Sequence, residues 1–168
     1  LLGPEMKSTG EVMGVGNTFG EAFAKSQRAA GVSLNRSGKV LLSIRDKDKA
    51  KLAFLAKMLA EKGFELVATK GTAEVIEQAG LQCEVVYKVN QGRPNTVDMI
   101  KNGQIQLIIN TTEGSRSISD SFTMRREALQ NGVNYYTTMA GARAMCYALG
   151  ELDAGDVNSL QELHERLR

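Results

Sequence analysis

Residues 39–72 read KVLLSIRDKDKAKLAFLAKMLAEKGFELVATKGT, and this stretch decides the fold of the chain. The apolar run Val40–Ile44 is typical of a buried strand, and residues 47–62 have the spacing of an amphipathic helix that ends at Gly63. A second strand pattern, Phe64–Ala68, follows directly. Strand, helix and strand therefore succeed one another, which predicts a parallel pair of strands joined by a helical crossover.

The same alternation continues along the chain. The uninterrupted apolar run at residues 105–109 is typical of a central strand that is buried on both faces. Successive strands joined by helices predict a mostly parallel sheet that is covered on both faces. The further strands are predicted at residues 84–87, 105–109 and 133–136, and the further helices at residues 72–78, 95–102, 120–130 and 139–149.

The two ends of the chain lie outside this alternation. Residues 1–16 are rich in glycine and have neither a helical nor a strand period, so we expect a loop. Thr18 and Glu21 form a capping-box pattern that predicts a helix ending near Gly31. A final helix is predicted from Asn158, with Leu160, Leu163 and Leu167 on one face.

Composition excludes several classes of protein. Hydrophobic residues make up 42% and charged residues 24% of the 168 residues, as in soluble globular domains. The 21 basic and 19 acidic residues are interleaved, so no basic face for a nucleic acid is expected. No apolar run approaches the ~20 residues of a membrane span, and the first residues lack a signal-peptide pattern. Cys83 and Cys146 lack metal-ligand spacing and are interpreted as buried thiols of a cytoplasmic protein.

Polar side chains follow the ends of the predicted strands, where an open parallel sheet binds its ligands. The sequence Thr69-Lys70-Gly71-Thr72 lies at a strand-to-helix turn, where free amides, the helix dipole and a glycine favour a phosphate. Lys49 and Lys88 follow the first and third predicted strands and would complete an anion site. In the alternative interpretation, Thr72 is an N-cap and the lysines are solvated surface charges. Asn110-Thr111-Thr112 follows a further strand and could bond ribose hydroxyls.

Candidate catalytic groups are scarce at these strand ends. The single histidine, His164, belongs to the final helix and is interpreted as a surface side chain. Asp46, Asp98 and Asp120 lie near helix starts, where carboxylates cap amides and complement the helix dipole. The glycines of GEVMGVG, residues 10–16, do not follow a strand, so the dinucleotide-binding fingerprint is not met. The residues therefore predict the binding of a small anion, with no catalytic and no metal site.

Several segments resemble the large subunit of bacterial carbamoyl-phosphate synthetase. LGPEMKSTGEVMG, residues 2–14, is similar to the end of its second ATP-grasp unit. The remainder resembles the regulatory domain that follows that unit and shares the fold of methylglyoxal synthase. The resemblance divides the chain into residues 1–16 (ATP-grasp tail), 17–38 (helix and connector) and 39–168 (regulatory domain). It is carried by LLSIRDKDK (41–49), ELVATKGTA (65–73), YKVNQGRPN (87–95), IKNG (100–103), LIINTTEG (107–114) and RREAL (125–129).

The resemblance implies an α/β/α fold of three layers, with a five-stranded parallel sheet in the order 3-2-1-4-5. It implies an allosteric domain that binds UMP as inhibitor, IMP as weak activator and ornithine as activator. Thr137 matches an ornithine contact, whereas the acidic partners of ornithine belong to the synthetase region upstream of this chain. Carried over residue by residue, the nucleotide phosphate would be held by Ser43, Lys49, Thr69, Thr72 and Lys88, and the ribose by Asn110 and Thr112.

The resemblance also implies the context of the domain. The parent enzyme is a ligase that makes carbamoyl phosphate from glutamine, bicarbonate and ATP, with Mg or Mn and K, for pyrimidine and arginine synthesis. The partners implied are the rest of the large subunit and the glutaminase small subunit, with no nucleic acid and no membrane. No cofactor and no catalytic residue are expected in this chain itself.

A phosphate lyase similar to methylglyoxal synthase is the strongest alternative. Here the histidine-aspartate pair of that family reads Arg45-Asp46, and its glycine-glycine-aspartate lies around Gly92-Arg93-Pro94. Of its catalytic acids only Asp120 is retained, so we expect phosphate binding without acid-base chemistry. A relative of the purine cyclohydrolase and an unattached nucleotide-binding module also stay open on the pocket residues. The opening ATP-grasp segment disfavours both.

Overall fold

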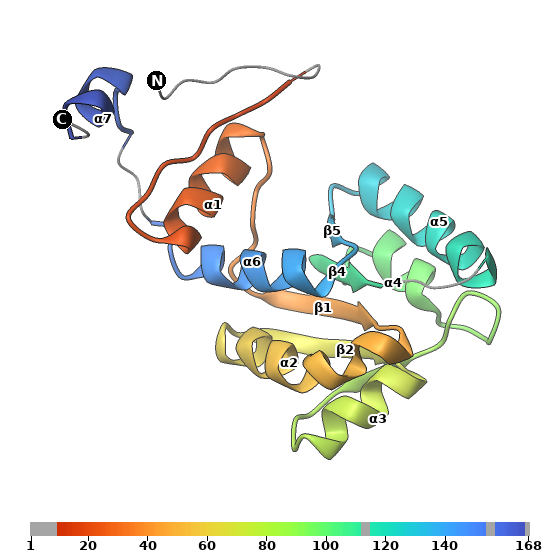
Figure 1. Cartoon of the computed structure of the whole chain (residues 1–168). Coiled ribbons are helices and arrows are strands. Elements are labelled where there is room, and N and C mark those ends of the chain that lie inside the picture. Colours follow the sequence, from red (N-terminus) through yellow and green to blue (C-terminus); the bar gives the residue numbers. More distant parts are fainter. Residues whose placement is uncertain (1–9, 112–114, 154–156, 167–168) are drawn as a thin grey trace. The chain divides into compact units, whose positions relative to one another are not determined.

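A computed structural model describes residues 10–111, 115–153 and 157–166 of the chain. Contacts divide the chain into two compact units. One consists of residues 35–143, and the other of residues 1–34 together with residues 144–168. Figure 1 labels most of the helices and strands.

The unit of residues 35–143 is built on a five-stranded sheet. Its strands are β1 (Gly38–Ser43), β2 (Phe64–Thr69), β3 (Glu84–Val86), β4 (Leu107–Asn110) and β5 (Asn134–Tyr136). All neighbouring strands are parallel, in the order β3-β2-β1-β4-β5 (Figure 1). The central strand is β1, whose Val40 lies opposite Leu66 of β2 and Leu107 of β4. The predicted sheet and its strand order are confirmed.

Helices cover both faces of this sheet. They are α2 (Leu52–Glu61), preceded by the 3-10 helix η1 (Asp46–Lys51), then α3 (Lys70–Gln78), α4 (Thr96–Lys101) and α5 (Ser115–Gln130), and α6 (Met139–Leu149) begins in this unit. The chain moves outward from β1 to β2 and β3 through α2 and α3, so right-handed crossovers place both helices on one face. The strands β4 and β5 lie on the other side of β1, so α4 and α5 cover the opposite face, and each pair of helices is in contact (Figure 1).

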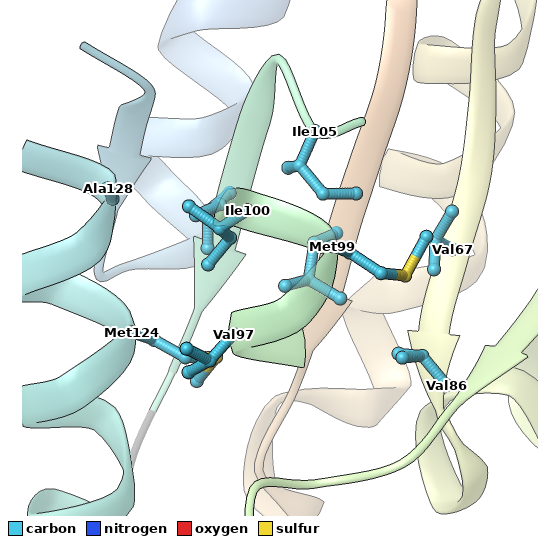
Figure 2. Close-up of a cluster of buried hydrophobic side chains, with 10 residues drawn as sticks. Val67, Val86, Val97, Met99, Ile100, Ile105, Met124 and Ala128 are labelled. Atoms are coloured by element: carbon cyan, nitrogen blue, oxygen red, sulfur yellow. The ribbon is translucent and has the colours of Figure 1, made fainter. Parts of the chain in front are cut away.

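A hydrophobic cluster joins the sheet to α4 and α5. Because alternate strand residues point to opposite faces, Leu41 and Val67 share this cluster while their chain neighbours face α2 and α3. Figure 2 shows Met99 of α4 pointing toward Val67 of β2, and Met124 of α5 beside Val97 of α4. Complete burial of such a side chain stabilises the fold by about 1.5–3 kcal/mol. The cluster therefore holds the strand ends in fixed positions.

The helix predicted for residues 47–62 is divided in the structure. Its first part, η1, buries no residue, because DKDKAK has no large apolar side chain to pack on the sheet. The α-helix begins only at Leu52, which is buried together with Leu55. Strand β4 also begins later than predicted, at Leu107 and not at Ile105. Helix α5 begins at Ser115, before the predicted start at residue 120. The sequence did not indicate this earlier start, because residues 115–119 read SRSIS and contain a single apolar residue.

The other unit contains α1 (Phe19–Ala29), the end of α6, and α7 (Leu160–Glu165). Thr18 caps α1 as predicted, since its hydroxyl accepts a hydrogen bond from the Glu21 amide at 3.1 Å. The Glu21 carboxylate also accepts a hydrogen bond from the Asn17 amide at 2.7 Å. On α7, Leu163 is buried as predicted, Leu160 is 38% exposed, and Leu167 lies outside the described residues.

Residues 10–16 contain neither helix nor strand, as predicted, but they contact α1 closely. A Cβ atom added to Gly14 would collide with the carbonyl oxygen of Ala22, and one added to Gly16 would lie 2.7 Å from the Ala22 amide nitrogen. Glycine permits this approach of backbone to helix. The segment therefore packs within the chain, which its lack of an apolar period did not predict.

The two thiols differ in burial. Cys146 is buried as expected, but Cys83 is only half-buried, so the expectation of two buried thiols was wrong for Cys83. It immediately precedes the edge strand β3, where only one neighbouring strand covers it. Burial, followed by the charges of Glu77 and Glu84, raises the pKa of the Cys83 thiol to about 11.

Candidate functional site

The candidate site lies at the carboxyl ends of the central strands. The crossover from β1 leaves through α2 on one face, and the crossover from β4 leaves through α5 on the other. The ends of β1 and β4 are therefore the switch point at which parallel sheets bind ligands. Ser43 and Asn110 are register partners there, so the sheet brings together two of the residues predicted for the nucleotide.

Two threonine hydroxyls connect β2 and α3 to the turn after β1. The Thr72 hydroxyl accepts a hydrogen bond from the Ile44 amide at 3.0 Å and lies 3.3 Å from the Thr69 hydroxyl. Both threonines are buried, and the N-cap of α3 is Thr69, so the alternative interpretation of Thr72 as an N-cap is wrong. Thr72 instead fixes the amino end of α3 beside the loop that leaves β1.

The amino end of α3 has features that favour the binding of an anion. Its first turn contains no acidic residue, and the N-cap Thr69 makes no side-chain cap bond. The ammonium nitrogen of Lys49 lies 3.3 Å from the position that a Cβ atom on Gly71 would occupy. A free helix start with a lysine above a glycine combines a positive dipole, unpaired amides and a full charge. This arrangement suits a phosphate group.

The Lys49 ammonium is also paired with a carboxylate. The Lys49 ammonium contacts the Asp46 carboxylate at 2.7 Å, and the side chain of Lys49 is 28% exposed against 92% for Asp46. The hydrogen bond from Lys49 and its charge, and the more distant charge of Lys88, hold the pKa of Asp46 below its ordinary value. Lys49 and Lys88 therefore act on the same position, although their strands, β1 and β3, are not neighbours.

A tyrosine that the sequence did not single out orients Asn110. The buried Asn110 amide nitrogen donates a hydrogen bond to the Tyr135 hydroxyl at 2.6 Å. The Tyr135 ring packs on the core cluster, and the Arg125 guanidinium lies 5.5 Å from the ring centre. The second atom of the Asn110 amide, its carbonyl oxygen, is an acceptor. No sequence signal places Tyr135 here, because a cross-strand contact depends on register.

Thr111 has a structural part in the site. Its hydroxyl accepts from the Arg45 amide at 3.0 Å, and its own amide donates to the Ser43 carbonyl at 3.0 Å. The loop after β1 is thus bonded on one side to Thr72 and on the other to Thr111. In the sequence, the triplet Asn110-Thr111-Thr112 was interpreted as a possible contact of ribose hydroxyls. It did not predict that Thr111 bonds the loop after β1.

The remaining predicted residues lie in different places. Thr137 is exposed directly after β5, and Thr112 lies outside the described residues, as does the side chain of Asp120. Asp98 caps α4 by accepting from the Asn95 amide at 3.0 Å, as its position near a helix start indicated. His164 is half-buried on α7, in the unit that contains residues 144–168.

Two further features are absent from the described part of the chain. Within residues 10–111, 115–153 and 157–166, no helix has the length and hydrophobicity needed to cross a membrane. Across the same residues, no three His, Cys, Asp or Glu side chains gather where they could hold a metal ion.

Known proteins resemble this chain in sequence. The MGS-like domain family matches residues 51–137. The carbamoyl phosphate synthase large chain of Xanthomonas campestris pv. campestris is 56% identical over 99% of this chain and 16% of that protein. The large chain of the same name from Pseudomonas putida is 54% identical over 100% of this chain and 16% of its own length. The chain thus spans about one sixth of the length of the curated relatives that it matches.

A solved structure resembles the fold. The crystal structure of methylglyoxal synthase from Elizabethkingia anophelis NUHP1 matches with a TM-score of 0.51 and 19% sequence identity. The match covers 67% of this chain and 79% of that one. The family match extends from the helix after β1 to the end of β5 and so includes most of the parallel sheet. The chain therefore belongs to the MGS-like domain family.

Proposed function

We propose that this chain is the allosteric regulatory domain of a glutamine-dependent carbamoyl phosphate synthase. In this proposal UMP inhibits, IMP activates weakly, and ornithine activates, while ligase chemistry takes place elsewhere in the large chain. The observation that carries the proposal is the Lys49 ammonium above Gly71 at the free start of α3. Together with 52–56% identity to large chains over essentially the whole sequence, it supports a phosphate-binding domain of that enzyme.

The proposed nucleotide lies across the carboxyl ends of β1, β2, β3 and β4. Its phosphate accepts hydrogen bonds from the start of α3 and from the hydroxyls and ammonium groups around it, and its ribose bonds to the Asn110 amide and to Thr112. The contact between Lys49 and Asp46 supports a role for Lys49, because a phosphate can share or replace that carboxylate. The phosphate ligands in this proposal are Ser43, Lys49, Thr69, Thr72 and Lys88.

The proposal extends to partners and setting. Ornithine would contact Thr137, and its acidic ligands would come from the rest of the large chain. The domain would act in the cytoplasm with that chain and a glutaminase small subunit, in pyrimidine and arginine synthesis, with ATP and its metal ions bound elsewhere. Residues 1–16 would be the tail of an ATP-grasp unit, residues 17–38 a helix and connector, and residues 39–168 the regulatory domain.

Calorimetric titration of the chain with UMP, IMP and ornithine tests the proposal. We expect both nucleotides to bind, because the phosphate and ribose ligands all belong to this chain. Ornithine should bind weakly or not at all, because its acidic partners are missing. A chain that binds neither nucleotide would contradict the proposed function.

A phosphate lyase is the second candidate, supported by the fold shared with methylglyoxal synthase. The residue after the end of β1 at which that reaction would need a histidine is Arg45, whose side chain contacts the Asp48 carboxylate at 2.7 Å. We therefore expect no release of phosphate from dihydroxyacetone phosphate. Turnover that disappears in Asp120→Asn would favour the lyase over the regulatory domain.

A further inference from the structure

A second surface of the sheet unit has the character of a docking site. A pocket of about 350 Å³ is lined by the end of η1 and the first turns of α2 and α6, two helices that Figure 1 labels. Its floor includes the buried side chains of Leu55 and Met139, and Phe54 forms an apolar wall although it is 59% exposed. An aromatic ring beside an open apolar pocket is typical of a surface that is covered in the complete protein.

The charged side chains among the described residues that line this pocket are all positive. Lys51 and Arg143 line it, both are exposed, and neither has a hydrogen bond or ion pair among the described residues. Among the residues that the structure describes, no acidic side chain lines the pocket. The first turn of α6 also contains no acidic residue, so its positive end is not neutralised from within the helix. The surface is therefore complementary to a carboxylate flanked by apolar groups.

We infer that this pocket receives an acidic, apolar segment from the remainder of the large chain. The chain spans 16% of the relatives that it matches, so most of such a protein is available to cover the pocket. A second copy docking through the same face would bring the cations of two pockets together, which disfavours a symmetric dimer. The inference rests on membership of a large chain and does not depend on the nucleotide site.

A segment docked in this pocket would lie close to the carboxyl edge of the sheet. Lys51 is the last residue of η1, whose first turn holds Asp46, and α6 follows β5 and Thr137. A segment bound between α2 and α6 therefore contacts elements that begin at the carboxyl edge of the sheet. This places the interface next to the nucleotide and ornithine residues of the proposed function without using any of them.

Zero-length crosslinking of the full-length large chain tests the inference. A carbodiimide activates a carboxylate, the Lys51 amine attacks it, and an amide forms as the carbodiimide leaves as a urea, so only groups in direct contact are joined. Mass spectrometry of the digest should find Lys51 linked to an Asp or Glu outside the 168 residues of this chain. Lys57, on the same helix with its ammonium 4.0 Å from Glu61, is the matched control and should link only to Glu61.

Variants and isotopes separate the outcomes. Lys51→Arg keeps the charge but has no amine, so the link should disappear, and Arg143→Glu should reduce it by repelling the docked carboxylate. Large chains with light and heavy nitrogen are mixed before crosslinking. A Lys51 link that joins light to heavy chains, a link only within residues 35–143, or no link at all would overturn the inference. Binding of UMP would be unaffected by each of these outcomes.

Discussion

At the scale of single residues, contacts within the chain position the charged and polar groups of the candidate site. Lys49 lies above Gly71, and its partner Asp46 is almost fully exposed. Asn110 is held by Tyr135, so one end of its amide is fixed and its carbonyl oxygen has a set direction. Such order lowers the entropy cost of binding, since fewer side chains must be immobilised by the ligand.

The bond between Asn110 and Tyr135 leads to a prediction about stability. Tyr135→Phe leaves the buried Asn110 amide without its partner, and we expect unfolding free energy to fall by roughly 1–2 kcal/mol. Urea denaturation measures the change. Tyr147→Phe is the control, because the Tyr147 hydroxyl has no hydrogen bond among the described residues and its ring edge contacts Phe19. Equal losses in the two variants would show that the Asn110 bond contributes nothing.

The raised pKa of Cys83 predicts slow thiol chemistry. The reactive form is the thiolate, and a pKa of about 11 keeps the folded Cys83 protonated at neutral pH. At pH 8 we expect Cys83 to react with a thiol reagent on the order of 100-fold more slowly than the unfolded chain. The rate should rise with pH up to about 11. Cys83→Ser identifies its share of the signal, and rapid labelling in the native protein would contradict the assigned burial.

At the scale of helices and strands, the turn from β2 into α3 is the part of the site most sensitive to shape. Gly71→Ala would place a methyl group 3.3 Å from the Lys49 ammonium, which is closer than most real contacts of this kind. The Lys49 ammonium would have to shift by a few tenths of an ångström relative to the helix start. We expect phosphate and UMP binding to weaken by about tenfold with little change in thermal midpoint, as measured by calorimetry. Gly80→Ala is unsuitable as a control because Gly80 has φ +79°, whereas Glu74→Ala is suitable because Glu74 is exposed on α3.

The same scale shows why the sequence predicted which residues lie close together at the candidate site. In a parallel sheet, all strands end at one edge, so residues after β1, β2 and β4 must lie together once the alternation of strands and helices is recognised. This argument found Ser43, Thr69, Thr72 and Asn110. It did not predict the hydrogen bond between Asn110 and Tyr135 or the bond from the Arg45 amide to Thr111, because these contacts depend on strand register and side-chain direction. The α-helical starts of α2 at Leu52 and of α5 at Ser115 were also misplaced, because polar residues precede or form them.

At the scale of the whole molecule, the contacts between residues 10–16 and α1 lead to a prediction about truncation. Deleting residues 1–16 would uncover the face of α1 on which Gly14 and Gly16 lie. The unit of residues 35–143 contains the phosphate ligands and should be untouched. We expect α1 to become less protected in hydrogen exchange while UMP affinity stays unchanged. Loss of UMP binding on truncation would mean that the segment belongs to the regulatory core.

The central claim is that a nucleotide phosphate binds at the carboxyl ends of the strands, and one calorimetric comparison tests it most directly. UMP is titrated into the unaltered chain, into Lys88→Ala, and into Lys57→Ala as a control in which an exposed lysine of α2 is removed. Because Lys88 supplies a charge to the phosphate, we predict that its removal weakens UMP binding by roughly 10- to 100-fold. Lys57→Ala should bind as the unaltered chain does. Equal UMP affinity in Lys88→Ala and Lys57→Ala would contradict the account.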